Sequence, residues 1–295
     1  MNDPVAMRRR LRVELKRLRS QADLTQRQVA NDLDWSPSKI IRIENGSVAV
    51  GVTDLRALLD RYGVHDKQAI DELVEMARAS KRQPFSEYKE ILAPETIKFF
   101  GYEASASIIR QFEPLVLPGL LQTEEYARAV LQIHEIPTDK ADLYVESRHE
   151  RQELFDRQNP PELFFIVDES VLLRPIGGRS AMRHQLQHLL QVATHPRVTI
   201  QVIPLSFGAY AGLRGPFALL EFPSADDPDV LYLENRLGGD RTFVDEPETT
   251  GQYRAMFWAM EDQASKPEEL DEYVRRAMNT LGPSNLPAKR SVAGT

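Results

Sequence analysis

Apolar residues in the first 80 positions recur at helical spacing in five short segments. In the first segment, Leu11, Leu15 and Leu18 form an apolar stripe between basic residues. The four segments that follow are expected to end near Leu33, Glu44, Tyr62 and Ser80. The pattern therefore predicts an all-α N-terminal region of five short helices.

Polar residues mark where two of these helices begin. Thr25 stands three residues before Gln28, the spacing of a capping box in which each side chain satisfies a backbone amide of the other residue. Ser36 is a candidate N-cap, and Pro37 suits the first helical position because its missing N–H is not needed there. The turn before this helix holds Trp35, which we expect to pack in the core.

From residue 95 onward the pattern changes to a mixture of strands and helices. Short runs rich in β-branched and aromatic residues predict strands at residues 163–167, 198–203, 217–222 and 230–233. Helical spacing predicts helices at residues 123–134, 141–157, 180–194, 249–263 and 267–281. The expected fold class is an all-α N-terminal domain followed by a larger α+β C-terminal domain.

Charge supports a division of the chain at about residue 82. Residues 1–82 hold 16 Lys and Arg against 12 Asp and Glu, whereas the remaining residues hold 21 against 32. Opposite charge balances on two segments indicate different binding partners. We expect a helical domain at residues 1–82, a linker at 83–95, a second domain at 96–281 and a mobile tail at 282–295.

The second and third predicted helices, joined by a tight turn, form a helix-turn-helix motif. In such a motif the first helix crosses the phosphate backbone, and the second places its N-terminal side chains at base edges in the major groove. Leu24, Thr25 and Gln26 open the motif, and residues 36–46 follow the spacing Ser-x-x-x-Ile-x-x-Ile-Glu-x-Gly. Residues 11–65 resemble the lambda-repressor-like regulators of the XRE type, which implies a lambda-repressor-like helix-turn-helix fold.

Four residues of the second helix are candidates for contact with base edges. The isoleucines at positions 40 and 43 must face the core, and this turns Ser38, Lys39 and Arg42 outward. Lys39 and Arg42 can donate to O6 and N7 of guanine, and Ser38 can serve several bases or a phosphate. Pro37 has no amide donor, so its contact would be apolar, for example with a thymine methyl group.

Phosphate contacts are expected where the helices of the motif begin. Gln26 and Arg27 start its first helix and Ser36 precedes its second, and side chains and free amides at such positions meet a phosphate. The resemblance implies a further phosphate contact at Asn45. It also implies a partly buried structural ion pair between Arg19 and Glu44, with a solvated helix end as the alternative for the glutamate.

A run of arginines near the N-terminus leaves two interpretations open. Arg8, Arg9, Arg10 and Arg12 stand close together before the first apolar stripe is complete. They form either an arm that follows the DNA backbone or a charge run that solubilises the helix. Phosphate contacts from such an arm would add affinity and salt dependence without sequence choice.

A second resemblance covers about residues 95–280. Its segments include residues 117–122 (Leu-Pro-Gly-Leu-Leu-Gln), 174–178 (Arg-Pro-Ile-Gly-Gly), 201–204 (Gln-Val-Ile-Pro) and 215–217 (Gly-Pro-Phe). In this order and spacing they resemble the C-terminal domain of the WhiJ-like regulators of actinobacteria. The resemblance implies a transcriptional regulator, sometimes antitoxin-like and encoded beside a small partner protein, and it assigns no chemistry to this domain.

No catalytic motif or cofactor site stands out in the sequence. Glycine-rich nucleotide loops, the nucleophile elbow of hydrolases and cysteine are all missing. His184 and His188 have a spacing that could hold a metal ion, but they lie opposite the apolar face of their helix, which favours a solvated pair. Asp168 is expected to cap the short helix after its strand. We therefore expect no catalytic residue, no metal and no cofactor.

Together these features predict a sequence-specific DNA-binding transcriptional regulator that is not an enzyme. Residues 1–82 are its expected DNA-binding domain, and residues 96–281 are its expected regulatory or dimerisation domain. Its expected partners are double-stranded DNA, a second copy of itself in a homodimer on a pseudo-palindromic operator, and a small ligand or small protein received by the C-terminal domain. An antitoxin-like protein that mainly sequesters a small protein and autoregulates its operon is the alternative; an enzyme with a DNA-binding tether is a third. Without a signal peptide or a membrane-length apolar run, we expect a cytoplasmic protein with no membrane partner.

Overall fold

The computed structural model describes residues 4–44, 48–80, 84–133, 137–223, 227–234 and 241–282. Packing divides the chain into two compact units. Unit 1 is Met1–Ser107 with Leu220–Asp229, and unit 2 is Ile108–Leu219 with Val230–Thr295. The sequence boundaries at residues 82 and 96 rest on composition rather than on packing, and they stay a prediction.

Five helices form the helical domain, the N-terminal part of unit 1. They are α1 (Pro4–Gln21), α2 (Gln26–Asp32), α3 (Pro37–Glu44), α4 (Val52–Arg61) and α5 (Lys67–Ala79). The predicted helix starts are confirmed: Thr25 and Gln28 form a capping box, and the hydroxyl of Ser36 accepts from the amide of Lys39 at 3.3 Å. Unit 1 also contains α6 (Pro94–Ser105), which packs against α1.

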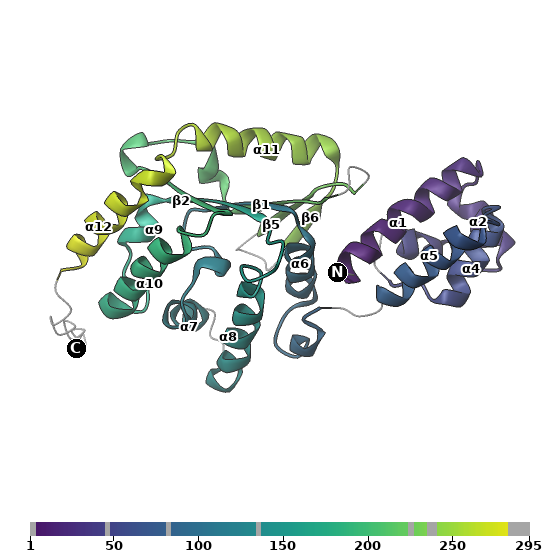
Figure 1. The fold of residues 1–295 in the computed structure, drawn as a ribbon, viewed down its shortest axis with the longest axis horizontal. Helices are drawn as coiled ribbons and strands as arrows, with labels where there is room; N and C mark the ends of the chain where they lie inside the picture. Colours follow the sequence, from purple (N-terminus) through teal and green to yellow (C-terminus); the bar gives the residue numbers. More distant parts are fainter. Residues whose placement is uncertain are drawn as a thin grey trace, which may run out of the picture. The chain divides into compact units, whose positions relative to one another are not determined.

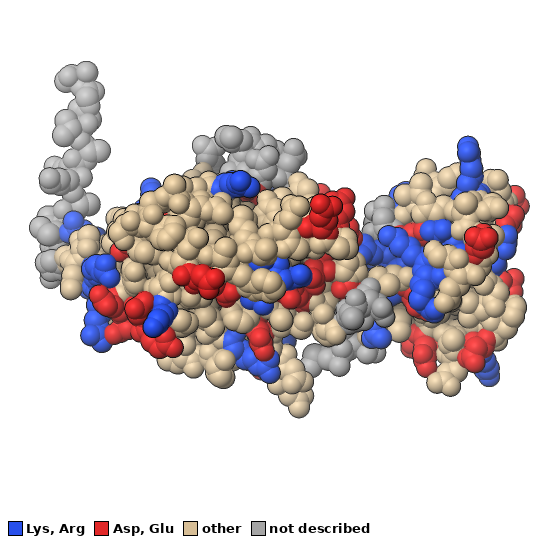
Figure 2. All heavy atoms as spheres, turned by 90° about the horizontal axis from the view of Figure 1, so that it is seen from above, with Lys and Arg blue, Asp and Glu red and all other residues tan. Residues whose placement is uncertain are grey.

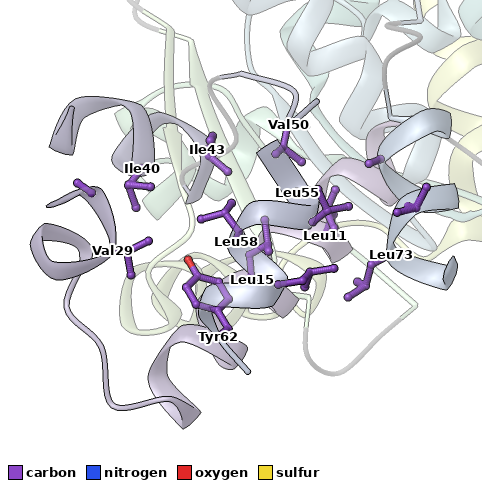
Figure 3. Close-up of a cluster of buried hydrophobic side chains, with 14 residues drawn as sticks. Leu11, Leu15, Val29, Ile40, Ile43, Val50, Leu55, Leu58, Tyr62 and Leu73 are labelled. Carbon is purple, nitrogen blue, oxygen red and sulfur yellow. The ribbon is translucent and has the colours of Figure 1, made fainter. Parts of the chain in front are cut away.

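The apolar stripes of α1 to α5 meet in a single core (Figure 3). Leu15, Ala30 and Ile40, from three different helices, are each at most 1% exposed. Trp35 packs against the same cluster from the turn, which confirms the prediction made for it. α2 to α5, with seven to thirteen residues each, are marginal alone in water, so burial of these side chains supplies most of their stability.

Arg9 of α1 is buried in unit 1, where it contacts Asp227. Its Nε donates to Asp227 Oδ1 at 2.9 Å, and its guanidinium carbon lies 3.5 Å from the centre of the Phe222 ring. Arg9 is 3% exposed and Arg12 is 9% exposed. For these two arginines, therefore, both the arm along DNA and the solvated charge run are wrong, because neither side chain is on the surface.

The sheet has six strands in the order β3-β2-β1-β4-β5-β6. They are β1 (Ile108–Glu113), β2 (Glu162–Asp168), β3 (Val198–Ile203), β4 (Phe217–Glu221), β5 (Val230–Glu234) and β6 (Arg241–Val244). β1, β2 and β3 are parallel, with Leu163 opposite both Ile109 and Val198. β5 and β6 are antiparallel. The mixed sheet confirms the predicted α+β class of the C-terminal region.

Parallel neighbours need a crossover connection, and helices supply it here. The chain passes from β1 to β2 through α7 (Glu124–Ile133) and α8 (Thr138–Gln152), and from β2 to β3 through α9 (Glu169–Leu173) and α10 (Gly178–Val192). These helices lie on one side of the sheet and α11 (Pro247–Glu261) lies on the other (Figure 1). The final helix, α12 (Leu270–Leu281), packs against α9 and α10.

Helices on both faces explain the composition of the central strands. Phe257 and Met260 of α11 pack against Phe112, Ile166 and other residues of one sheet face. Side chains of β2 are buried on both faces, so this strand is a nearly continuous apolar run rather than an alternating one. Short 3-10 helices complete the fold at Ser86–Tyr88, Gly119–Leu121, Leu205–Phe207, Ala211–Arg214 and Pro267–Glu269.

All four predicted strands and the predicted helices of the C-terminal region are present. The sequence pattern missed β1, β6 and α6. Asp168 Oδ1 accepts from the amide of Ser170 at 2.9 Å, so the predicted cap of α9 is confirmed. Among the described residues, the helices fall short of the length and apolar character that crossing a bilayer requires.

The Arg9–Asp227 pair generates a stability prediction. Burial raises the pKa of Asp227, although Arg9 beside it acts in the opposite direction. Asp227→Ala leaves a buried guanidinium without its carboxylate, and we expect a loss of about 3–5 kcal/mol of folding free energy. The double variant Arg9→Met, Asp227→Ala should recover most of this loss, because both charges then leave the interior. Calorimetric unfolding of the full chain measures the stability of the single and the double variant. If Asp227→Ala is as stable as the parent, the buried Arg9–Asp227 pair does not stabilise the fold.

Candidate nucleic-acid interface

α2 and α3 are joined by a tight turn at residues 33–36. The amide of Trp35 donates to the carbonyl of Ala30 at 2.8 Å, which closes the turn onto α2. Asp34 has a left-handed φ of 56°, a conformation that aspartate adopts more readily than most residues. The chain therefore changes direction sharply, and α3 leaves the turn in a defined orientation to α2.

Glu44, the last residue of α3, is 1% exposed and accepts hydrogen bonds from two other parts of the helical domain. Arg19 of α1 donates to its two carboxylate oxygens at 2.7 and 3.0 Å. Gln26, at the start of α2, donates from Nε2 to Oε2 of the same carboxylate at 2.7 Å. The hydrogen bond to Glu44 raises the pKa of Arg19. One buried carboxylate thus ties α1, α2 and α3 together, and Glu44 is not a solvated helix end.

The side-chain amide of Gln26 is therefore used inside the protein. The phosphate contact expected at Gln26 stays a prediction, and another donor of this residue, such as its backbone amide, has to make it. The side chains of Arg27 and Ser36 are exposed, which agrees with a role on the surface. Asn45, the remaining candidate for a phosphate contact, lies outside the described residues.

The exposed face of α3 consists of Pro37, Ser38, Ile41 and Arg42. Arg42 Nε donates to the carbonyl of Ser38 at 3.3 Å, so the guanidinium lies back along its own helix. Ile41 is 45% exposed, whereas Ile40 is 1% exposed. Sequence reasoning missed Ile41, although the signal was present: positions three and four after Ser38 share one helix face.

Lys39 does not lie on this face. Its Nζ is 3.0 Å from Asp54 Oδ2 of α4 and 3.5 Å from the centre of the Trp35 ring. The side chains of Lys39 and Asp54 are each about one-third exposed, at 32% and 35%. The predicted base contact by Lys39 thus requires the ammonium group to exchange an intramolecular carboxylate for DNA. Asp54 is a second residue that sequence reasoning missed, because only packing brings α4 to α3.

Charge on the helical domain is mixed rather than uniformly basic. Figure 2 shows basic side chains across the visible face of this domain, with acidic side chains among them. Some of the acidic groups are paired: Asp54 with Lys39, and Asp32 with Arg61, whose Nε donates to it at 2.7 Å. The excess positive charge of residues 1–82 is therefore found at individual exposed side chains, such as Arg27 and Arg42, and not as a uniform basic surface.

In unit 2, the carboxylates at the ends of the strands have structural partners. Asp168 accepts from the hydroxyl of Tyr210 at 2.7 Å, and Glu169 accepts from the amide of Leu205 at 2.9 Å. His184 lies 3.8 Å from a carboxylate oxygen of Glu125. Within the described part of the chain, no group of three or more metal-ligating side chains comes together. The candidate functional site is therefore the pair of helices α2 and α3, and not these side chains of unit 2.

Two protein families match the chain. A model described as a helix-turn-helix domain matches residues 10–73, which covers α2, α3 and the core beneath them. A model described as a domain of unknown function, DUF5753, matches residues 97–276, more than half of the 295 residues. No curated protein and no solved structure matches the chain.

The contact between Lys39 and Asp54 generates a binding prediction. Asp54→Asn removes the carboxylate that holds Lys39 and also removes a negative charge beside α3. We expect the full chain to bind duplex DNA about two- to fivefold more tightly, in line with the roughly 0.5–1 kcal/mol of an exposed ion pair. Titration of labelled DNA at several salt concentrations measures the change.

Asp32→Asn is the matched control for this variant. It removes the same charge from the helical domain but frees Arg61 rather than Lys39. We expect Asp32→Asn to change DNA affinity less than Asp54→Asn does. Equal effects of the two substitutions would show that net charge, and not the release of Lys39, controls binding.

Proposed function

The chain belongs to the DUF5753 family and carries a helix-turn-helix domain, and from this premise we propose that it is a sequence-specific DNA-binding transcriptional regulator. The proposal includes no catalytic step. DNA binding is the role of residues 1–82, and residues 96–281 receive a signal and supply the dimer contacts. That signal is a small ligand or a small protein.

The observation that carries the proposal is the exposed face of α3. Ser38 and Arg42 point outward from a helix whose opposite side is fixed in the core by Ile40 and whose end is fixed by Glu44. A rigid helix with a hydrogen-bonding outer face is what direct recognition of base edges in the major groove requires. Arg42 offers the bidentate donors that suit O6 and N7 of guanine.

The small size of this recognition element supports the proposed homodimer. α3 has eight residues, so one copy contacts only a few base pairs. Two copies on a pseudo-palindrome, with half-sites one helical turn apart, recognise enough base pairs for specificity. When one copy of a dimer binds its half-site, the second copy is held near the other half-site at a high effective concentration. This raises the affinity of the dimer for the full operator.

Selection from a random duplex pool with the full chain tests the proposal directly. The expected result is an enriched pseudo-palindromic sequence, followed by protection of both half-sites in a footprint. Binding that stays independent of sequence across the pool would overturn it.

Substitutions at Arg42 and Arg27 separate base contact from phosphate contact. Arg42→Ala should cost about 1–3 kcal/mol on the selected operator and relax preference at one position per half-site, because a bidentate contact to guanine is lost. Arg27→Ala should weaken binding to all sequences evenly and reduce its salt dependence, because a phosphate contact carries no base information. Repeating the selection with each variant measures the difference. Equal, sequence-independent losses would show that α3 is not the recognition helix.

The stoichiometry of the full chain on DNA provides a further prediction. We expect sedimentation to show two chains per full operator and a loss of affinity on the order of 10²-fold or more when one half-site is scrambled. A single chain on the full operator, with unchanged affinity after scrambling, would contradict the dimer.

An antitoxin-like role, mainly sequestering a small protein partner, is the second candidate within the same proposal. It shares DNA binding with the first candidate and differs in what residues 96–281 bind. A tight small-protein partner that co-purifies with the chain and alters operator binding favours it. Release from the operator by a small molecule favours a ligand-responsive regulator.

A further inference from the structure

The outer face of α3 carries an apolar side chain among polar ones. Within the described residues of the helical domain, the most exposed large apolar side chains are Ile41 at 45% and Val48 at 36%. Ile41 follows Ser38 by three residues and Arg42 follows Ser38 by four, so both lie on the side of the helix that Ser38 occupies. Its neighbours Ile40 and Ile43 are 1% and 5% exposed, so they, and not Ile41, supply the apolar contacts of α3 with the core.

Helix formation does not explain an isoleucine at this position. A β-branched side chain loses χ1 freedom in a helix and has a lower propensity than alanine or the unbranched polar residues. At 45% exposure Ile41 also leaves much of its apolar surface in water. This exposed apolar surface is available to whatever α3 contacts.

The neighbours of Ile41 on α3 limit what its side chain can contact. Ser38 and Arg42 are the side chains placed to meet base edges, and an adjacent residue on the same face enters the same groove. In the major groove the apolar group that distinguishes one base from another is the C5-methyl group of thymine. We infer that Ile41 determines specificity by packing its side chain against a thymine methyl group beside the base contacted by Arg42.

This inference rests on the proposed function, because it requires α3 to lie in the major groove. It goes further by naming the base that an apolar residue recognises. A protein–protein contact through Ile41 is the competing explanation, and it predicts no dependence on any thymine methyl group.

The test pairs a change in the protein with a change of one methyl group in the DNA. The selected operator is prepared with each thymine replaced in turn by deoxyuridine, which removes only the C5-methyl group. We expect one thymine per half-site at which the full chain loses about fourfold in affinity, since burying one methyl-sized group contributes roughly this factor. Ile41→Ala should bind the thymine operator similarly weakly and lose nothing more when that thymine becomes deoxyuridine.

Two variants serve as controls. Ile133→Ala makes the same substitution at an isoleucine of α7 that is 67% exposed, and it should leave both affinity and methyl dependence unchanged. Arg42→Ala should weaken binding but keep the dependence on the methyl group. Because Ile41 is exposed, Ile41→Ala should retain the parent's unfolding temperature, which shows that any loss of affinity arises at the interface.

The outcomes separate this inference from the proposed function. If the full chain selects no DNA sequence, the proposed function itself fails. If it binds an operator but no deoxyuridine position weakens binding, or if Ile41→Ala keeps the full methyl dependence, the inference about Ile41 is overturned and the DNA-binding function stands.

Discussion

Three polar side chains meet beneath the surface of the helical domain, where the carboxylate of Glu44 accepts hydrogen bonds from Arg19 and Gln26. Water is largely excluded from this carboxylate, which is 1% exposed. A buried carboxylate without partners costs several kcal/mol, a large part of the 5–15 kcal/mol that a domain has in total. The three helix segments that supply these groups are therefore held in one arrangement, and the orientation of the α3 face depends on it.

The same constraint explains why short helices suffice. α2 has seven residues and α3 has eight, too few to be stable without tertiary contacts. Ile40 and Ile43 fix one side of α3 by burial, Ser36 caps its start, and Glu44 fixes its end. What is left outside is a narrow face whose side chains have defined positions.

Cationic residues of the helical domain have three different environments. Arg9 is buried against a carboxylate and an aromatic ring, Lys39 is held at the surface by Asp54 and Trp35, and Arg42 is exposed on α3. Only an exposed cation without a strong internal partner meets DNA at no cost in lost intramolecular contacts. A count of charges therefore overstates the positive surface available to a polyanion, and individual partners decide which residues contribute.

Much of the fold followed from the sequence, because its elements are encoded locally. Apolar spacing, the capping box at Thr25 and the cap at Ser36 determined the five N-terminal helices, and runs such as residues 163–167 determined the central strands. β1 was missed because Arg110, Gln111 and Glu113 interrupt its apolar pattern. Its place between β2 and β4 in the sheet makes this segment a strand.

In the candidate site, too, some features could be predicted from the sequence and others depend on tertiary contacts. The motif spacing alone identified α3 and the outward direction of Ser38 and Arg42. Tertiary structure decided the environments of Arg9, Lys39 and Ile41, because each depends on residues distant in sequence or on the exact rotation of a helix against its core. Sequence determines which faces are apolar and where helices begin, since those are local properties. Burial and ion pairing are properties of contacts, and contacts between distant segments exist only once the chain has folded.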